Sequence, residues 1–473
     1  MAKPLSIYVC SSCGAQSRQF FGRCNACGSW NTLVEQAGSS DNRRLRATPA
    51  VPGAASAVRP RRSQSIQAAG DQPLQRLASG YGELDRVLGG GLVPGSLVLL
   101  GGDPGIGKST LLLQSARAMA EQASVLYVSA EESAQQVKLR WRRLAVPAQA
   151  AEADVQLLAE TDLELVLQEL EALRPAVAII DSIQALHDAQ LASAPGSVAQ
   201  VRECAAALAR IAKRQDTAVL LVGHVTKEGM LAGPKVLEHL VDAVLTFEGD
   251  RFASHRLLRA VKNRFGATHE LGVFEMRDQG LAEVSNPSEL FLGGAEPSSG
   301  SATIVACEGT RPLLVELQAL VSGTSYASPR RSATGIAVNR LHQILAVLEK
   351  HLGLPLSRFD CYLAVAGGLE VEEPAADLGV AAAVVASYRD LVLPPGTVLV
   401  GELGLGGQLR TVGQLELRLQ EAERLGFARA VVPRASGLAG SARVAGLQVL
   451  EAGTVAEALV AALGVSLEED EPG

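Results

Sequence analysis

The octapeptide at residues 102–109, Gly-Asp-Pro-Gly-Ile-Gly-Lys-Ser, fits the pattern GxxxxGK[ST] and constrains the fold more than any other segment. A buried-strand run at 96–100 precedes it and a helical pattern at 109–114 follows, which is the setting that the motif requires. Glycines let the backbone approach phosphate oxygens, the lysine reaches the outer phosphates, and the serine hydroxyl ligates Mg²⁺. The chain is therefore expected to bind and hydrolyse a nucleoside triphosphate, ATP, through Gly102, Asp103, Pro104, Gly105, Ile106, Gly107, Lys108, Ser109 and Thr110.

Beyond this loop, short apolar runs alternate with longer helical patterns. Strands are predicted at 125–128, 155–158, 176–180 and 218–222, and helices at 133–144, 163–173 and 198–213. Such alternation predicts an α/β core with a mainly parallel sheet covered on both faces, and a site at the carboxyl ends of the strands. The predicted domain spans residues 73–285.

Acidic residues follow two of these strands. Asp181 ends an apolar run in the pattern that holds Mg²⁺, directly or through water, beside Ser109. Glu131 stands where a carboxylate can orient the attacking water, and the adjacent Glu132 could exchange roles with it. One of the two glutamates could instead cap the helix that begins near Ser133.

The segment after the last of these strands, residues 223–229, reads Gly-His-Val-Thr-Lys-Glu-Gly. It places His224 and Lys227 where a γ-phosphate sensor and a ligand-contacting loop could lie. Because a lone histidine is often only a hydrogen-bonded structural group, both interpretations of His224 stay open.

Four of the seven cysteines cluster near the N-terminus, as two CxxC pairs that are each followed by glycine. Two such turns direct four thiolates at one ion, which predicts a closed, structural zinc site within residues 1–35. A piece this small cannot build an adequate core, so zinc binding of about 10–16 kcal/mol would supply most of its folding energy. Accidental disulfides or free thiols are the alternative. The expected zinc ligands are Cys10, Cys13, Cys24 and Cys27.

The same module carries Phe20, Phe21, Arg23 and Trp30. These side chains could stack on bases or dock a partner, or they could form the small core of the module. The following segment, 36–72, is rich in Arg, Pro, Ala and Ser without periodicity and predicts a flexible basic linker.

The net charge of −7 gives no global sign of nucleic-acid binding, but the charge is uneven, since the linker is basic and the tail at 466–473 is acidic. No apolar run approaches the roughly 18 residues that a membrane span needs, and no secretory segment is found. A cytoplasmic protein that makes no membrane contact is expected. Cys204, Cys307 and Cys361 stand apart in apolar surroundings and are predicted to be buried thiols.

Several of these segments together resemble a known family. The run Ser-Gly-Tyr-Gly-Glu-Leu-Asp-Arg-Val-Leu-Gly-Gly-Gly-Leu at 79–92, with the segments at 127–133, 179–186 and 223–229, is similar to the RecA-like ATPases. With the four-cysteine module and Lys-Asn-Arg-Phe-Gly at 262–266, the chain resembles the RadA family of bacterial DNA-repair proteins over nearly its whole length. That resemblance implies a DNA-dependent ATPase and translocase that promotes branch migration of recombination intermediates.

The resemblance also implies partners and assembly. These are single-stranded and branched DNA, the bacterial recombinase, and further copies of the chain in a hexameric ring. Two alternatives stay open, an ATP-dependent Lon-like protease and a RecA-fold regulatory ATPase that acts on protein.

RecA-like motors bind ATP between neighbouring subunits, so the resemblance implies that residues 262–266 act at that junction. Lys262 and Arg264 offer two cations on a tight turn, and a cation delivered to the γ-phosphate can be worth about 10³–10⁵ in rate. Contact with the DNA backbone, or no role at all, are the alternatives.

Residues 290–465 predict an α+β domain, with strands at 304–305 and 361–365 and helices at 339–351, 378–387 and 416–425. The segments 373–379 and 401–410 resemble the Lon protease domain. That resemblance puts Asp377 at the position of the nucleophilic serine and Glu416 at that of the activating lysine. Since neither carboxylate can perform its step, we expect the fold without proteolysis.

The family resemblance further implies that this domain shapes the ring and lines a channel for DNA. Candidate contacts to the DNA backbone are Arg330, Arg331, Arg340 and Lys350. Charge on a solvated helix face explains some of them equally well.

Overall fold

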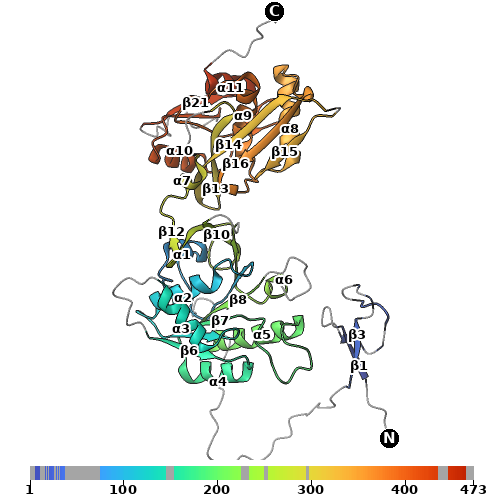
Figure 1. Cartoon of the computed structure of the whole chain (residues 1–473), viewed down its shortest axis with the longest axis vertical. Helices are drawn as coiled ribbons and strands as arrows, with labels where there is room; N and C mark the ends of the chain where they lie inside the picture. Colours follow the sequence, from blue (N-terminus) through green and yellow to red (C-terminus); the bar gives the residue numbers. More distant parts are fainter. Residues whose placement is uncertain are drawn as a thin grey trace, which may run out of the picture. The chain divides into compact units, whose positions relative to one another are not determined.

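A computed structural model describes residues 75–144, 154–224, 234–249, 254–293, 298–326, 328–434 and 446–464, with parts of the segment 6–37. The chain divides into two compact units, one holding residues up to 268 and 274–283, the other 269–273 and 284 onward (Figure 1). The predicted acidic tail, and the predicted linker beyond residue 37, lie outside the described residues. No helix in the described ranges is both long and apolar enough to span a membrane.

The N-terminal module is a three-stranded antiparallel sheet of order β2-β1-β3, from Gln16–Ser17, Ser6–Cys10 and Leu33–Ala37. Its buried residues are Cys10, Cys24 and Leu33. Trp30 is 69% exposed, with the Arg23 guanidinium 5.9 Å from its ring centroid, and Phe21 is also exposed. The interpretation of Phe21 and Trp30 as a core is therefore wrong, because the cysteines occupy that place; Phe20 lies outside the described residues.

The first unit is built on a nine-stranded sheet of order β12-β11-β10-β9-β4-β8-β7-β5-β6. Strands β4 to β9 are parallel, which confirms the predicted parallel core. β10 runs antiparallel to β9, and β12 runs antiparallel to β11. The sequence analysis predicted none of the four strands β9 to β12. The bounds are β4 Leu97–Gly102, β5 Val125–Ser129, β6 Val155–Ala159, β7 Val177–Asp181, β8 Ala218–Val222, β9 Ala243–Glu248, β10 His255–Asn263, β11 Leu271–Arg277 and β12 Gly280–Glu283.

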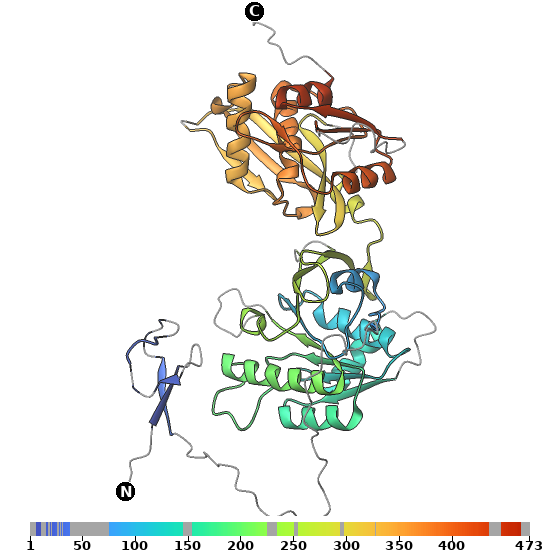
Figure 2. The ribbon, with the colours of Figure 1, turned by 180° about the vertical axis from the view of Figure 1, so that it is seen from behind.

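Helices cover both faces of this sheet because successive strand residues point to opposite sides. Val98 and Leu100 join one apolar cluster with helix α2, whereas Leu97 and Leu99 join another with α5. Figure 2 shows α4 beside α5. The helices are α1 Gly82–Leu88, α2 Lys108–Met119, α3 Ala134–Arg143, α4 Leu163–Leu173, α5 Val198–Gln215 and α6 Pro234–Leu237.

The start of α3 corrects one prediction. The cap is Ser133, whose hydroxyl accepts the backbone N–H of Gln136 while the Gln136 side chain accepts that of Ser133. This reciprocal capping box satisfies the first turn. Neither Glu131 nor Glu132 is therefore needed as a cap.

The second unit is α+β, as predicted, with a seven-stranded sheet of order β15-β16-β14-β13-β17-β20-β21. Its α9 is buried along most of its length against β13 and β14. The strands are β13 Ser301–Glu308, β14 Arg311–Gly323, β15 Arg331–Thr334, β16 Phe359–Val365, β17 Thr397–Leu399, β20 Arg429–Pro433 and β21 Gln448–Ala452, with a small pair β18 Glu402–Leu403 and β19 Leu409–Arg410. The helices are α7 Ser288–Phe291, α8 Val338–Leu352, α9 Asp377–Arg389, α10 Leu415–Arg424 and α11 Val455–Leu463.

An ion pair between half-buried Arg340 and buried Asp377 joins α8 to the first turn of α9. Asp377, only 2% exposed, accepts from Arg340 Nε at 2.7 Å and from the backbone N–H of Leu403 at 2.9 Å. The same guanidinium also donates to Gln343. Arg340 is thus occupied inside the unit, which argues against its predicted role as a DNA contact.

The other basic side chains predicted as DNA contacts differ in their surroundings. Arg330 stacks on Tyr326, with its guanidinium carbon 3.8 Å from the ring centroid, and Arg331 donates to the Leu356 carbonyl. Lys350 is exposed in the last turn of α8. Exposed Glu416, which the Lon resemblance placed at the position of the lysine, lies in the first turn of α10.

Replacing Arg340 by alanine leaves the Asp377 carboxylate buried without its ion-pair partner. The free energy of unfolding of the second unit should therefore fall by about 3–5 kcal/mol at pH 7. Burial already raises the pKa of Asp377, and loss of Arg340 raises it further. A protonated carboxyl needs no cation, so the loss should shrink as the pH falls toward that raised pKa. Thermal unfolding of the full chain between pH 7 and pH 5 measures this.

Arg410→Ala is the matched control, since it removes an exposed pair with Glu402 at 3.7 Å. Such pairs contribute about 0–1 kcal/mol. Equal unfolding temperatures for the two variants would contradict the assignment of the Arg340 pair as stabilising.

Candidate functional site

One cleft of about 530 Å³ lies in the first unit where β4, β5, β7 and β8 end. Parallel strands bring their carboxyl ends to one edge of the sheet, so residues far apart in sequence meet there. Of the predicted site residues, those that line the cleft are Pro104, Gly105, Gly107, Lys108, Ser109, Thr110, Glu131, Asp181 and His224, and the alternative base Glu132 lines it as well.

The phosphate loop needs glycine at two positions for both conformation and space. Gly102 has φ 151° and Gly107 has φ 118°, values that side chains disfavour. A Cβ at Gly102 would lie 2.5 Å from the Phe247 carbonyl oxygen, and one at Gly107 would lie 2.8 Å from the methyl carbon of Met276. Gly107 is also the N-cap of α2, so the helix N-terminus faces the cleft and favours an anion there.

Lys108 is 3% exposed and is held by its own loop. Its ammonium donates to the carbonyl oxygens of Gly102 at 2.7 Å and Asp103 at 2.9 Å. Burial lowers the pKa of Lys108, while the carboxylates of Asp181, Asp103 and Glu131 oppose that shift. Gly102 and Asp103 thus act through their carbonyls rather than by lining the cleft.

The third predicted loop residue that does not line the cleft is Ile106. Its side chain is buried, and its carbonyl accepts Arg256 Nε at 3.3 Å.

Asp181 and Ser109 together fit a magnesium ion. Both line the cleft, and a carboxylate with a hydroxyl supplies the oxygen donors that Mg²⁺ prefers. Asp181 also accepts the Tyr127 hydroxyl on Oδ2 at 2.6 Å. Burial raises the pKa of Tyr127, so this hydroxyl keeps its proton and donates. The sequence analysis missed Tyr127, although a tyrosine in a fully buried strand needs a hydrogen-bond partner.

Glu131 and Glu132 have different partners. Glu131 Oε1 accepts the hydroxyl of Ser182 and lies 3.1 Å from His224 Nε2. The hydrogen bond with His224 lowers the pKa of Glu131 below its ordinary value. Glu132 instead pairs with Arg140 at 2.6 Å.

His224 therefore contacts Glu131 directly. Its partner in the sequence analysis, Lys227, lies outside the described residues.

Three arginines that the sequence analysis did not select also line the cleft. Arg140 and Arg143 lie three residues apart on α3 and so share a helix face, and Arg256 comes from the start of β10. The basic run on α3 was visible in the sequence. Only the packing of α3 decides that Arg140 and Arg143, and not Arg142, face the cleft.

Lys262 and Arg264 lie away from this cleft. β10 runs antiparallel to β9, since Leu257 pairs with Glu248, the last residue of β9, and Asn263 pairs with Ala243, its first residue. β9 is parallel to β4 and ends at the cleft. β10 therefore begins at the cleft and ends on the opposite side of the sheet. At about 3.3 Å per residue, the six residues from Arg256 to Lys262 span about 20 Å.

The two cations of the segment 262–266 are also not equivalent. Lys262 lies in β10, and its ammonium donates to the carbonyls of Glu238 at 2.5 Å and Val241 at 2.9 Å. Arg264 follows the strand, pairs with Asp242 at 2.9 Å and keeps 53% of its side chain exposed. The sequence analysis expected both cations on one turn, but only Arg264 lies on the turn with an exposed side chain.

The turn that carries Arg264 packs on the triple glycine at 89–91. Arg76 bridges the two segments by donating to the carbonyls of Gly89 at 2.5 Å and Phe265 at 2.7 Å. A Cβ at Gly266 would lie 2.8 Å from the Gly89 Cα. Two motifs that were separate in the sequence therefore form one surface.

In the N-terminal module, Cys10 and Cys24 are both buried. Cys13 and Cys27 lie outside the described residues. Of the isolated cysteines, Cys204 and Cys361 are buried as predicted, and burial raises their pKa values to about 12 and about 11. Cys307 is only partly buried.

Comparison with known proteins adds two family matches. The family described as AAA domain matches residues 64–230, and the family described as Rubredoxin metal binding domain matches residues 8–35. The second match includes all four clustered cysteines, which supports zinc binding.

Full-length relatives and solved structures are also similar. The DNA repair protein RadA of Synechocystis sp. is 56% identical over 98% of this chain and 95% of the relative, and that of Bacillus subtilis is 48% identical over 98% and 100%. A KaiC-like protein from Pyrococcus horikoshii is 20% identical with a TM-score of 0.37, covering 45% of this chain and 100% of that one. The RadB recombinase is 22% identical with a TM-score of 0.35, covering 44% and 100%.

Proposed function

The chain belongs to the RadA family of DNA repair proteins, and from this premise we propose that it is a DNA-dependent ATPase that moves along DNA and drives branch migration of recombination intermediates. The observation that carries the proposal is the cleft at the carboxyl edge of the sheet, where Lys108, Asp181 and Glu131 meet. A nucleotide-binding AAA domain and a zinc ribbon are features of the chain itself.

Five side chains of the cleft have distinct roles in the proposed hydrolysis. Lys108 and the N-terminus of α2 bind the negative phosphates. Ser109 and Asp181 would hold Mg²⁺, which would neutralise charge on the phosphates when bound. Glu131 accepts a hydrogen bond from the attacking water and orients it. The contacts with His224 and Ser182 hold the Glu131 carboxylate in position, and the hydrogen bond with His224 favours its ionised form.

Replacing Glu131 by glutamine should lower ATP turnover about 10²–10⁴-fold with little change in nucleotide affinity, because the amide cannot take up the proton of the water. Glu132→Gln is the matched control, since it makes the same change at the adjacent cleft residue, whose carboxylate is paired with Arg140. Steady-state turnover and equilibrium binding of a fluorescent ATP analogue measure the two effects. A larger loss of turnover in the Glu132 variant would instead assign the orientation of the water to Glu132.

Arg264 acts on the nucleotide of a neighbouring copy. Its strand begins at the cleft and carries it about 20 Å or more away, so it cannot reach the phosphates bound by its own chain. Asp242, buried and bonded to the N–H of Leu97, holds the guanidinium in place. A closed ring of copies, which we take to be a hexamer, lets each Arg264 serve the next cleft.

Arg264→Ala should lower DNA-stimulated turnover about 10³-fold and leave nucleotide binding nearly unchanged. Lys108→Ala should abolish binding and turnover in its own cleft. Because the two defects lie on different subunits of one junction, a mixture of the two inactive variants should recover part of the turnover. A mixture that stays inactive would argue that Arg264 acts within its own chain or on DNA.

Lys262→Ala provides the comparison. It removes a cation that is bonded to two carbonyls inside the unit, so we expect it to lower the unfolding temperature more than Arg264→Ala does.

The remaining parts serve this motor. The second unit is a scaffold without protease activity, in which the Asp377 carboxylate at the Lon serine position is paired with Arg340. The zinc module recruits DNA or the bacterial recombinase through its exposed Trp30 and the adjacent Arg23.

The direct test of the proposed function is ATP turnover with and without single-stranded DNA. Single-stranded DNA should stimulate turnover in the wild type and not in Lys108→Ala, and the DNA affinity should fall steeply with salt because counterions are released. Turnover that is indifferent to DNA would favour a protein substrate instead.

A further inference from the structure

We propose that Tyr127 is a positioning residue for the magnesium site, holding one oxygen of Asp181 so that the other faces the ion. This inference rests on the proposed function, since it assigns a role within that ATP site. Tyr127 does not line the cleft itself, so its role would be exerted through Asp181.

The register of the sheet brings the two side chains together. β5 and β7 are parallel neighbours that pair Tyr127 with Ile179 and Ser129 with Asp181. Ile179 and Asp181 lie two residues apart and share one face of the sheet, the face on which Tyr127 packs. The Tyr127 side chain therefore spans one diagonal step along the sheet to reach Asp181 Oδ2 at 2.6 Å.

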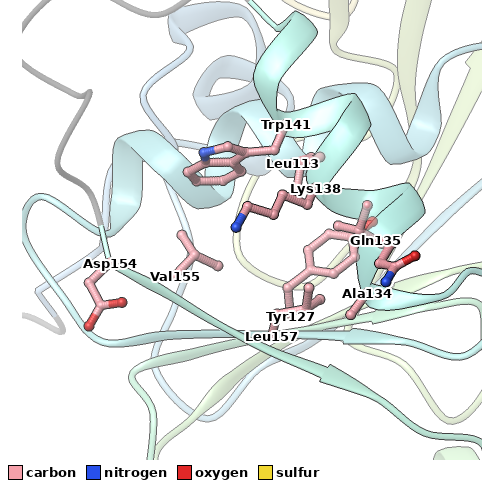
Figure 3. A pocket seen from close by; sticks show the side chains of 10 residues that line it. Leu113, Tyr127, Ala134, Gln135, Lys138, Trp141, Asp154, Val155 and Leu157 are labelled. Atoms are coloured by element: carbon pink, nitrogen blue, oxygen red, sulfur yellow. The ribbon is translucent and has the colours of Figure 1, made fainter.

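The ring of Tyr127 is held by apolar neighbours. It is 1% exposed and lies beside a hollow of about 360 Å³, where Figure 3 shows it between the strands and α3. Tyr127 belongs to the same buried apolar cluster as Leu113 and Val137, and Leu113, Val137, Trp141, Val155 and Leu157 line the hollow with it. The ring is buried in this cluster, and its hydroxyl donates to Asp181.

The two oxygens of Asp181 are consequently different. Oδ2 accepts from Tyr127, whereas Oδ1 accepts no hydrogen bond from the described part of the chain. A donor on one oxygen of a ligating carboxylate orients the other toward the metal, and loss of such a partner typically costs about 10–100-fold in metal affinity or activity. The hydrogen bond thus prepares Asp181 for Mg²⁺ before the nucleotide arrives.

The simpler explanation is that Tyr127 only fills the core. Tyr127→Phe distinguishes the positioning role from core filling, because it keeps the ring and removes only the hydroxyl. Tyr81→Phe is the matched control, since the Tyr81 hydroxyl lies in the same unit, packs on the same apolar cluster and accepts from Gln114 at 2.9 Å instead of touching the site.

The experiment is equilibrium binding of a fluorescent ATP analogue to the full-length protein, first in EDTA and then across a Mg²⁺ titration. Tyr127→Phe should bind the analogue in EDTA as the wild type does, but should need about 10-fold more Mg²⁺ for the half-maximal gain in affinity. Tyr81→Phe should match the wild type in both conditions, and unfolding temperatures of all three proteins report on the fold.

The outcomes separate this inference from the proposed function. A wild type that binds no nucleotide would overturn both. The positioning role alone would be overturned if Mg²⁺ raised the nucleotide affinity of the wild type and the Tyr127→Phe variant gave the same Mg²⁺ titration curve. If Tyr127→Phe and Tyr81→Phe both lost nucleotide affinity, and lost as much in EDTA as in Mg²⁺, the role of Tyr127 would be packing.

Discussion

The parallel hydrogen-bonded register of β4, β8, β7 and β5 is the constraint on which the rest of the first unit depends. It places the ends of these strands at one edge, so that Lys108, Glu131, Asp181 and His224 share one cleft although they span more than a hundred residues of sequence. The same register gives Tyr127 its reach to Asp181. Both faces of the sheet are buried, so a slip in register would move every strand side chain into the wrong layer.

Charge pairing is the second constraint. Buried Lys108 lies among the carboxylates of Asp181 and Glu131, whose charges offset the cost of its burial. In the second unit, Arg340 pairs with Asp377, and Arg418 pairs bidentately with Glu373. The Asp377 position, which corresponds to a nucleophile in the Lon resemblance, therefore contributes to holding α8 and α9 together.

Local patterns predicted most of the elements well. The helix predicted at 163–173 is α4 Leu163–Leu173, and the strand predicted at 218–222 is β8 Ala218–Val222, because amphipathic spacing and apolar runs are read within one segment. The strands from β9 to β12 were missed. The segment that holds them lacks the clear alternation of strand and helix patterns seen before it. In addition, β9 joins the sheet by pairing with β4, which lies more than 140 residues earlier in the sequence.

The sequence by itself determined the phosphate loop, the paired cysteines and the acidic strand ends, because each depends on residue types at fixed short spacing. Only the tertiary structure decided that Glu131 contacts His224 while Glu132 pairs with Arg140, that Arg256 enters the cleft, and that Arg264 lies at the far edge of the sheet. Those outcomes depend on strand order and helix packing. Such long-range contacts leave no periodic signal in the chain, and they are set by how the layers bury their apolar faces.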